Sequence, residues 1–234
     1  MMWKKKMKES ISTYSRRTQL AKRIVRFLMR IVFRITVEGG EHVPAEGGII
    51  VATNHLSRWD IPLLLLIPNR LDLTGMVTDK YLDYPLIRFF VNLVGGIWLD
   101  RTRADFGAFR TAIQALDAGQ ALGIAPEGTR SDTGGLIEGK PGAILLAIKS
   151  QSPVVPAGLS GTETAAKNWW KRPRLKIHFG EPFVLPPLTH ENRNEQMQTS
   201  TDEMMCRIAA LLPEKYRGVY AAHPRLQELL AENE

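Results

Sequence analysis

Cysteine is nearly absent from this chain of 234 residues, in which Cys206 is the single example. One thiol cannot form an internal disulfide, so the composition permits a reducing cytosolic compartment. Paired Cys and His residues at the spacings that bind zinc are also missing from the sequence. We therefore expect an activity that needs neither a metal nor another cofactor.

Two common catalytic motifs are incomplete. The run from Gly134 to Lys140 imitates a phosphate-binding loop, but Pro141 stands where a serine or threonine should bind magnesium. The run from Gly158 to Thr162 is one residue short of the Gly-x-Ser-x-Gly turn of serine hydrolases. Nucleotide hydrolysis and a serine nucleophile are therefore not predicted.

Long uninterrupted apolar runs are missing as well, most notably near the N-terminus. Residues 1–36 hold eleven Lys or Arg and one acid, a net charge of +10, although the whole chain carries only +7 and the remainder therefore −3. Arginines break each apolar run there every few residues, which excludes a membrane span and a secretory signal.

This N-terminal segment has the pattern of a basic amphipathic helix. Its cations and its apolar residues each recur every three or four positions. The cations are Arg23, Arg26, Arg30 and Arg34, and the apolar residues are Ile24, Leu28, Ile31 and Ile35. We expect this helix to lie on the cytoplasmic face of a membrane as a peripheral or monotopic anchor, its cations facing anionic lipid. Two alternatives stay open: the apolar face packs on the protein, or the segment binds nucleic acid, which no neighbouring DNA-binding fold supports.

The rest of the chain alternates strand-like and helix-like segments, which predicts a single α/β domain over residues 37–234 after the N-terminal segment 1–36. The expected strands are 35–38, 48–53, 121–124, 154–159 and 175–179. The expected helices are 61–67, 106–118 and 141–150, together with a peripheral helix after Pro187. Trp169 and Trp170 are either a membrane anchor or part of the core.

A histidine and an aspartate follow the strand at 48–53, in the sequence Asn54-His55-Leu56-Ser57-Arg58-Trp59-Asp60. Residues five apart on a straight helix point about 140° away from each other, so His55 and Asp60 meet only if the chain bends between them. A strand–loop–helix junction supplies that bend. Asp60 is also a candidate N-cap of the next helix, and a lone histidine after a strand is often only a packing residue.

Two further strand-like segments end in polar loops. Ala121–Ile124 is followed by Ala125-Pro126-Glu127-Gly128-Thr129-Arg130-Ser131. The run Gly95-Gly96-Ile97-Trp98-Leu99-Asp100-Arg101-Thr102-Arg103 is again a strand that ends in charged residues. In open α/β sheets, ligands bind beyond the carboxyl ends of the strands. We expect these loops to meet the histidine loop at one edge of the sheet.

Together these residues resemble the glycerolipid acyltransferase family, which contains lysophosphatidate and glycerol-3-phosphate acyltransferases. The resemblance covers roughly residues 36–185 and rests on four blocks in order. They are the His-x4-Asp block at 54–60, Gly96–Arg101, Pro126–Ser131 and Val154–Pro156. Ala125 departs from the family pattern, where an aromatic residue is common. The resemblance implies a mixed central sheet flanked by helices.

The resemblance also implies acyl transfer from a thioester, carried by acyl-CoA or acyl carrier protein, to the sn-2 hydroxyl of lysophosphatidate, with phosphatidate as product. His55 is then the general base for that hydroxyl and Asp60 orients the imidazole. The substrate-binding residues implied by the same blocks are Lys80, Arg101, Arg103, Glu127, Gly128, Thr129 and Arg130. Arginine suits phosphate because its guanidinium binds two oxygens at once, whereas Glu127 is expected to orient the glycerol or an arginine.

Other activities fit the same residues. Glycerol-3-phosphate or another lysolipid would use the same His–Asp chemistry as acceptor. A membrane-binding module without catalysis is an alternative from a different class. A hydrolase of acyl esters is a third, and it predicts turnover with water alone.

Overall fold

Seven strands form one sheet in the computed structural model, which describes residues 16–100, 102, 105–189 and 191–232. The strands are β1 (Arg34–Glu38), β2 (Ile49–Thr53), β3 (Thr74–Thr78), β4 (Ile97–Leu99), β5 (Ala121–Ile124), β6 (Val154–Ser160) and β7 (Arg174–Phe179). Their order is β1-β7-β6-β2-β5-β3-β4, and β6 pairs antiparallel with β7 whereas the other pairs are parallel. The predicted α/β fold with a mixed sheet is confirmed.

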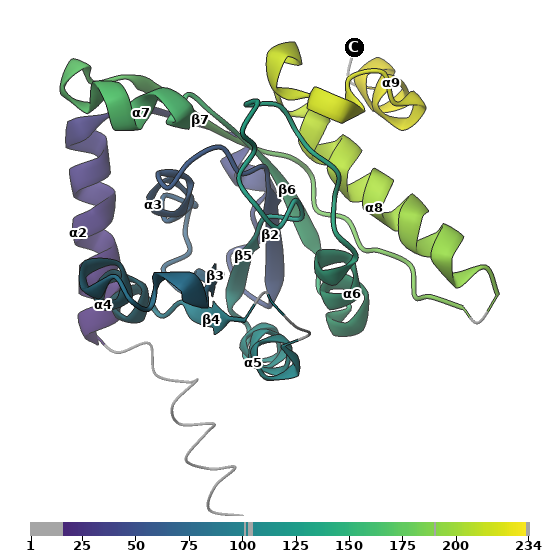
Figure 1. Ribbon diagram of the computed structural model, residues 1–234, viewed down its shortest axis with the longest axis horizontal. Coiled ribbons are helices and arrows are strands. Elements are labelled where there is room, and N and C mark those ends of the chain that lie inside the picture. Colours follow the sequence, from purple (N-terminus) through teal and green to yellow (C-terminus); the bar gives the residue numbers. More distant parts are fainter. Residues whose placement is uncertain (1–15, 101, 103–104, 190, 233–234) are drawn as a thin grey trace, which may run out of the picture.

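Helices cover both faces of the sheet (Figure 1). On one side lie α2 (Arg16–Val32), α3 (Asp60–Leu64) and α4 (Pro85–Val94). On the other side lie α5 (Phe106–Asp117), α6 (Pro141–Ser150) and α8 (Arg193–Ala210). The short α7 (Thr162–Asn168) follows β6, and α9 (Pro224–Ala231) packs on α8. Gly119 ends α5 with a φ of 83°, the left-handed conformation expected for a glycine after a helix.

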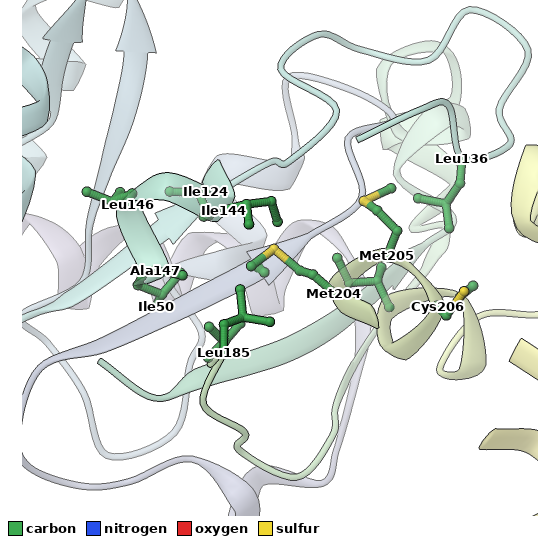
Figure 2. Close-up of a cluster of buried hydrophobic side chains, with 14 of the residues drawn as sticks. Ile50, Ile124, Leu136, Ile144, Leu146, Ala147, Leu185, Met204, Met205 and Cys206 are labelled. Atoms are coloured by element: carbon green, nitrogen blue, oxygen red, sulfur yellow. The ribbon is translucent and has the colours of Figure 1, made fainter. Parts of the chain in front are cut away.

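Each face of the sheet has its own hydrophobic core because side chains along a strand alternate between the two faces. In β2, Ile50 and Ala52 face the cluster under α5, α6 and α8, whereas Ile49 and Val51 face the cluster under α2 and α3. Figure 2 shows the first cluster, in which Met204, Met205 and Cys206 of α8 share one core with Ile50 of β2 and Ile144 of α6.

Two sequence predictions about these helices were wrong. The helix after Pro187 was expected to be peripheral, but the side chains of its second half, including Met204 and Ile208, are fully buried in α8. The first half of α8 is polar, and this polar composition led to the prediction of a peripheral helix although the second half is buried. The apolar run 61–67 was expected to be one helix, but α3 ends at Leu64. Pro68 follows that run, and a residue before proline disfavours the helical conformation.

Helix α2 lies against the domain through the buried side chains of Ala21 and Met29 and through two of its cations, Lys22 and Arg26. Lys22 is buried and its Nζ donates to the carbonyl of Leu73 at 2.5 Å. Arg26 donates to the carbonyls of Leu65, Ile67 and Arg70, the contact with Ile67 being 2.7 Å. Burial lowers the pKa of Lys22 to about 7. The prediction that Arg26 faces lipid was therefore wrong.

The apolar face of α2 points outward instead. Phe27 is 65% exposed, and its apolar neighbours on the same face are also largely exposed. The alternative in which this face packs on the protein was thus wrong as well. Residues 1–15 of the predicted N-terminal segment lie outside the described residues, and residue 36, its expected end, lies within β1. Among the helices of residues 16–232 that the structure describes, none is long and apolar enough to cross a bilayer.

Candidate active site

Three loops meet at one edge of the sheet because β2, β5, β3 and β4 run parallel to one another. Ala52 of β2 pairs in register with Ile124 of β5, so the residues that follow both strands emerge side by side. The loop after β2 carries His55, the loop after β5 carries Glu127, and Asp100 follows β4.

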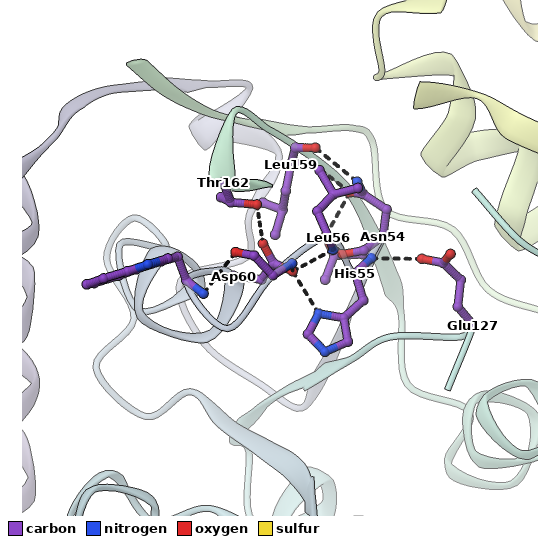
Figure 3. Close-up of polar contacts among 10 residues, drawn as sticks. Asn54, His55, Leu56, Asp60, Glu127, Leu159 and Thr162 are labelled. Atoms are coloured by element: carbon purple, nitrogen blue, oxygen red, sulfur yellow. Dashed lines mark hydrogen bonds and ion pairs between the residues drawn. The ribbon is translucent and has the colours of Figure 1, made fainter. Parts of the chain in front are cut away.

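His55 and Asp60 form a hydrogen-bonded pair (Figure 3). Their Nδ1 and Oδ2 atoms are 2.7 Å apart, because the chain bends between the end of β2 and the start of α3. Asp60 Oδ2 also accepts the main-chain N–H groups of Leu56 at 2.7 Å and Ser57 at 2.8 Å. The interpretation of Asp60 as an N-cap was wrong: it is the first residue of α3, and its carboxylate turns back to the preceding loop.

The pairing determines which histidine nitrogen can react. An ionised carboxylate only accepts hydrogen bonds, so Nδ1 of His55 carries the proton that Asp60 accepts. Nε2 is then left with a lone pair. The His55 side chain is 24% exposed and lines the cavity beside it, whereas Asp60 is 3% exposed. The imidazole can therefore accept a proton from a bound molecule.

The start of this loop and the carboxylate are both held from β6 and the turn after it. Asn54 is buried, and its side-chain amide exchanges two hydrogen bonds with the main chain of Leu159, at 2.7 and 2.9 Å. Thr162 donates its hydroxyl to Asp60 Oδ1 at 2.5 Å (Figure 3). Sequence reasoning missed Thr162, since nothing in a single sequence relates a threonine to an aspartate 102 residues away.

Glu127 joins the loops after β2 and β5. Its side chain is fully buried, with Oε1 accepting the N–H of His55 at 2.7 Å and Oε2 that of Ile137 at 3.0 Å. Burial raises the pKa of Glu127 to about 7, although both N–H groups favour the ionised form. Both oxygens of Glu127 therefore accept hydrogen bonds from main-chain N–H groups. The sequence had led us to expect that this carboxylate orients the glycerol or an arginine.

A cavity of about 410 Å³ opens beside the His–Asp pair. Its wall is mostly apolar and comes from β3, α3, α4 and the start of α6. The apolar residues include Leu64, Leu65, Leu73, Val77, Val91, Val94 and Leu146, with Gly75 and Gly123 between them. His55, Asp60, Tyr81, Asp100 and Lys140 supply its ionisable groups. His55 thus borders a space suited to a hydrocarbon chain.

The structure places the predicted substrate-binding residues unevenly. Gly128 lines the cavity. Of the next two residues in its loop, Thr129 is exposed and Arg130 is half-buried. Lys80 is exposed with its Nζ 5.1 Å from the ring centre of Tyr81, which lines the cavity. Arg101 and Arg103 lie outside the described residues.

Lys140 lines the cavity and was missed. Its main-chain N–H donates to the carbonyl of Pro126 at 2.8 Å, which brings it to the loop after β5. In the sequence it belongs only to an incomplete phosphate-loop motif. Within the described residues no group of three His, Cys, Asp or Glu side chains is placed to hold a metal ion.

Comparison with known proteins agrees with this arrangement. The model of the family described as Acyltransferase matches residues 34–160, which is more than half of the chain. The chain belongs to the acyltransferase family. The matched part of this acyltransferase runs from β1 to the end of β6 and contains both His55 and Asp60.

Several relatives share one name. A 1-acyl-sn-glycerol-3-phosphate acyltransferase of Bacillus subtilis is 25% identical over 177 residues, which are 76% of this acyltransferase and 87% of that protein. Proteins with the same name from Borreliella burgdorferi and Cocos nucifera are 28% and 34% identical. These matches cover 55% and 61% of this chain but only 52% and 45% of the relatives.

A solved structure shares the fold. The crystal structure of the 1-acyl-sn-glycerophosphate acyltransferase PlsC from Thermotoga maritima superposes with a TM-score of 0.61 at 23% identity. The superposition covers 79% of this chain and 76% of that one. The sheet with helices on both faces is therefore a known acyltransferase architecture.

Proposed function

We propose that this acyltransferase is a 1-acyl-sn-glycerol-3-phosphate acyltransferase, which moves a fatty acyl group from a thioester to the sn-2 hydroxyl of lysophosphatidate. The observation that carries the proposal is the hydrogen bond of 2.7 Å between His55 and Asp60 at the wall of an apolar cavity. The names of the relatives supply the acceptor. The product is phosphatidate.

His55 and Asp60 are the proposed catalytic pair. Nε2 of His55 takes the proton of the acceptor hydroxyl while the hydroxyl oxygen attacks the thioester carbonyl, a contribution of roughly 10²–10⁴-fold. Asp60 stabilises the imidazolium that forms. The tetrahedral intermediate then collapses, its C–S bond breaks, and the imidazolium returns the proton to the leaving thiolate. The acceptor itself is the nucleophile, so no enzyme serine is needed.

The cavity is the proposed site of the acyl chain. Its apolar wall removes methylene groups from water, each worth about 0.8 kcal/mol. For the acceptor phosphate we propose three cations: Lys140, which lines the cavity, Lys80, which precedes the lining residue Tyr81, and Arg130, two residues after the lining residue Gly128. Arg101 and Arg103 remain in this proposal on the strength of the sequence blocks.

An exposed apolar surface suits a membrane, and we call it the α2–α4 surface. It consists of Leu20, Ile24, Phe27, Leu28 and Ile31 of α2 with Leu86 and Phe89 of α4. Exposed Trp169 and Trp170 follow α7, near the end of α2 where Arg30 accepts a hydrogen bond from Arg172. This exposure is incompatible with their being core residues. We propose that the α2–α4 surface enters the cytoplasmic face of a membrane from one side.

The test is acyl transfer in detergent–lipid micelles with acyl-CoA and, separately, acyl carrier protein as donor. Wild type should form phosphatidate from lysophosphatidate, and His55→Ala should reduce the rate to background. His178→Ala is the control, because His178 is a half-exposed histidine on β7. Transfer only to glycerol-3-phosphate would replace the acceptor while keeping the mechanism. Release of free fatty acid without an acceptor would instead identify a hydrolase.

A further inference from the structure

The second oxygen of the Asp60 carboxylate has a partner of its own. Oδ2 accepts hydrogen bonds from His55 and from two main-chain N–H groups, while Oδ1 accepts one from the hydroxyl of Thr162 at 2.5 Å. Thr162 is fully buried and Asp60 nearly so. A buried hydroxyl that donates to a carboxylate forms a strong, directional bond in surroundings where water competes poorly.

This bond fixes how the carboxylate is turned. With Oδ2 alone held, the carboxyl group could rotate about its bond to Cβ and move Oδ2 away from the imidazole. The Thr162 hydroxyl on Oδ1 opposes that rotation and leaves Oδ2 aimed at His55 Nδ1 (Figure 3). Thr162 does not itself line the cavity, and its hydroxyl donates to Asp60 and not to the imidazole, so its influence passes through Asp60.

A tyrosine near the C-terminus holds the turn that carries Thr162. The hydroxyl of Tyr216 donates to Glu163 at 2.6 Å and accepts the N–H of Gly161 at 3.3 Å. These are the two residues on either side of Thr162. Gly161 has a φ of 85°, and a Cβ there would lie 2.2 Å from the carbonyl oxygen of Arg174, so the turn tolerates glycine alone.

We propose that Thr162 is a positioning residue for Asp60 and that Tyr216 in turn positions Thr162. The activity part of this proposal rests on the proposed function. Both residues lie beyond the segment 34–160 that matches the family model, whereas His55 and Asp60 lie within it. The orientation of the catalytic pair thus depends on parts of this chain outside the matched segment.

The first test separates catalysis from folding. Thr162→Val keeps the shape and removes the hydroxyl, and kcat should fall roughly tenfold to hundredfold, the loss typical of a hydrogen bond to a charged group. KM for lysophosphatidate should stay within about twofold, since Thr162 contacts no substrate site. Thr162→Ser should restore most of kcat. Thr111→Val is the matched control, because the exposed Thr111 donates to the carbonyl of Gly107 within α5, outside the turn that carries Thr162, and should leave kcat unchanged.

The second test does not need turnover. The Nδ1 proton of His55 should give a strongly downfield NMR signal, absent in His55→Ala. Thr162→Val should move or broaden it and Thr162→Ser should preserve it, while Thr111→Val should have no effect. Tyr216→Phe should cause a smaller change in the same direction, and it decides the proposal if Thr162→Val does not fold. If Thr162→Val folds and both its NMR signal and its kcat are unchanged, the inference is overturned. If Thr162→Val does not fold, the same result in Tyr216→Phe overturns it. If wild type transfers no acyl group, the proposed function fails and the NMR signal alone decides the positioning role.

Discussion

Glu127 Oε1 accepts the main-chain N–H of His55 at 2.7 Å, although Glu127 lies 72 residues later in the chain. The carboxyl group is fully buried, and each of its oxygens accepts a hydrogen bond from a main-chain N–H group. A buried acid of this kind fixes the distance between the loops after β2 and β5. Its protonation is therefore tied to the stability of the site.

Glu127 should make stability fall as the pH rises. Its pKa is raised from 4.5 to about 7 in the folded protein, so between those values the folded state binds a proton that the unfolded state has lost. Stability contributed by this proton is present below about pH 4.5 and is lost by about pH 7. Relative to Glu127→Gln, wild type should lose roughly 1–3 kcal/mol of unfolding free energy over that range. Urea unfolding of both proteins at pH 5, 6, 7 and 8 measures the difference, and a difference that grows in favour of wild type contradicts the assigned direction.

Asp60→Asn should abolish most activity while leaving the fold intact. An amide at this position can present an N–H to the imidazole, which favours the wrong tautomer, and kcat should fall roughly 10²–10⁴-fold. His55→Ala combined with Asp60→Asn should be no slower than the slower single variant, because the two side chains act as one unit. Losses that simply multiply in the double variant would show that the two residues act independently.

Much of the fold and part of the site follow from local sequence. Strand β5 and helix α6 have the predicted bounds, since Gly and Pro mark their ends and apolar residues fill them. The His55–Asp60 contact requires only a bend at a strand–loop–helix junction, which the residue types indicate. Thr162 and Tyr216 could not be found in this way, because their contacts depend on how distant segments of the chain meet.

The orientation of α2 shows the same limit. Its pattern of cations and apolar residues is periodic, but periodicity does not say which face turns inward. The inward direction of Arg26 depends on hydrogen-bond acceptors at the turn where α3 ends. There Arg26 donates to the carbonyls of Leu65, Ile67 and Arg70. Only the folded chain brings that turn under α2. An arginine therefore points inward while Phe27 and Leu28 face outward.

Phe27→Glu should weaken binding to lipid vesicles roughly tenfold. Burial of a phenylalanine side chain is worth about 1.5–3 kcal/mol, and a carboxylate is also repelled by anionic lipid. Sedimentation with vesicles of phosphatidylglycerol and phosphatidylcholine measures the bound fraction. Val219→Glu is the control, because Val219 is 62% exposed but lies outside the α2–α4 surface. Equal losses for both variants would mean that added charge, rather than the α2–α4 surface, governs binding.

Gly75→Val should shorten the preferred acyl chain. Gly75 of β3 and Gly123 of β5 are partners in register and both line the cavity. A Cβ on Gly75 would meet only the carbonyl oxygen of Gly123, at 3.4 Å, so a valine side chain must extend into the space that we assign to the hydrocarbon. Each methylene excluded costs about 0.8 kcal/mol, or roughly fourfold in kcat/KM.

The ratio of kcat/KM for short and long acyl thioesters measures this effect and corrects for any general loss of activity. Short chains should keep their rate in Gly75→Val while long chains lose theirs progressively beyond a fixed length. A uniform loss at all lengths would place the hydrocarbon elsewhere. Because Gly75 belongs to the apolar wall and is not among the residues that hold His55 and Asp60, a length-dependent loss would connect the cavity to donor selection while the contacts of the proposed base stay in place.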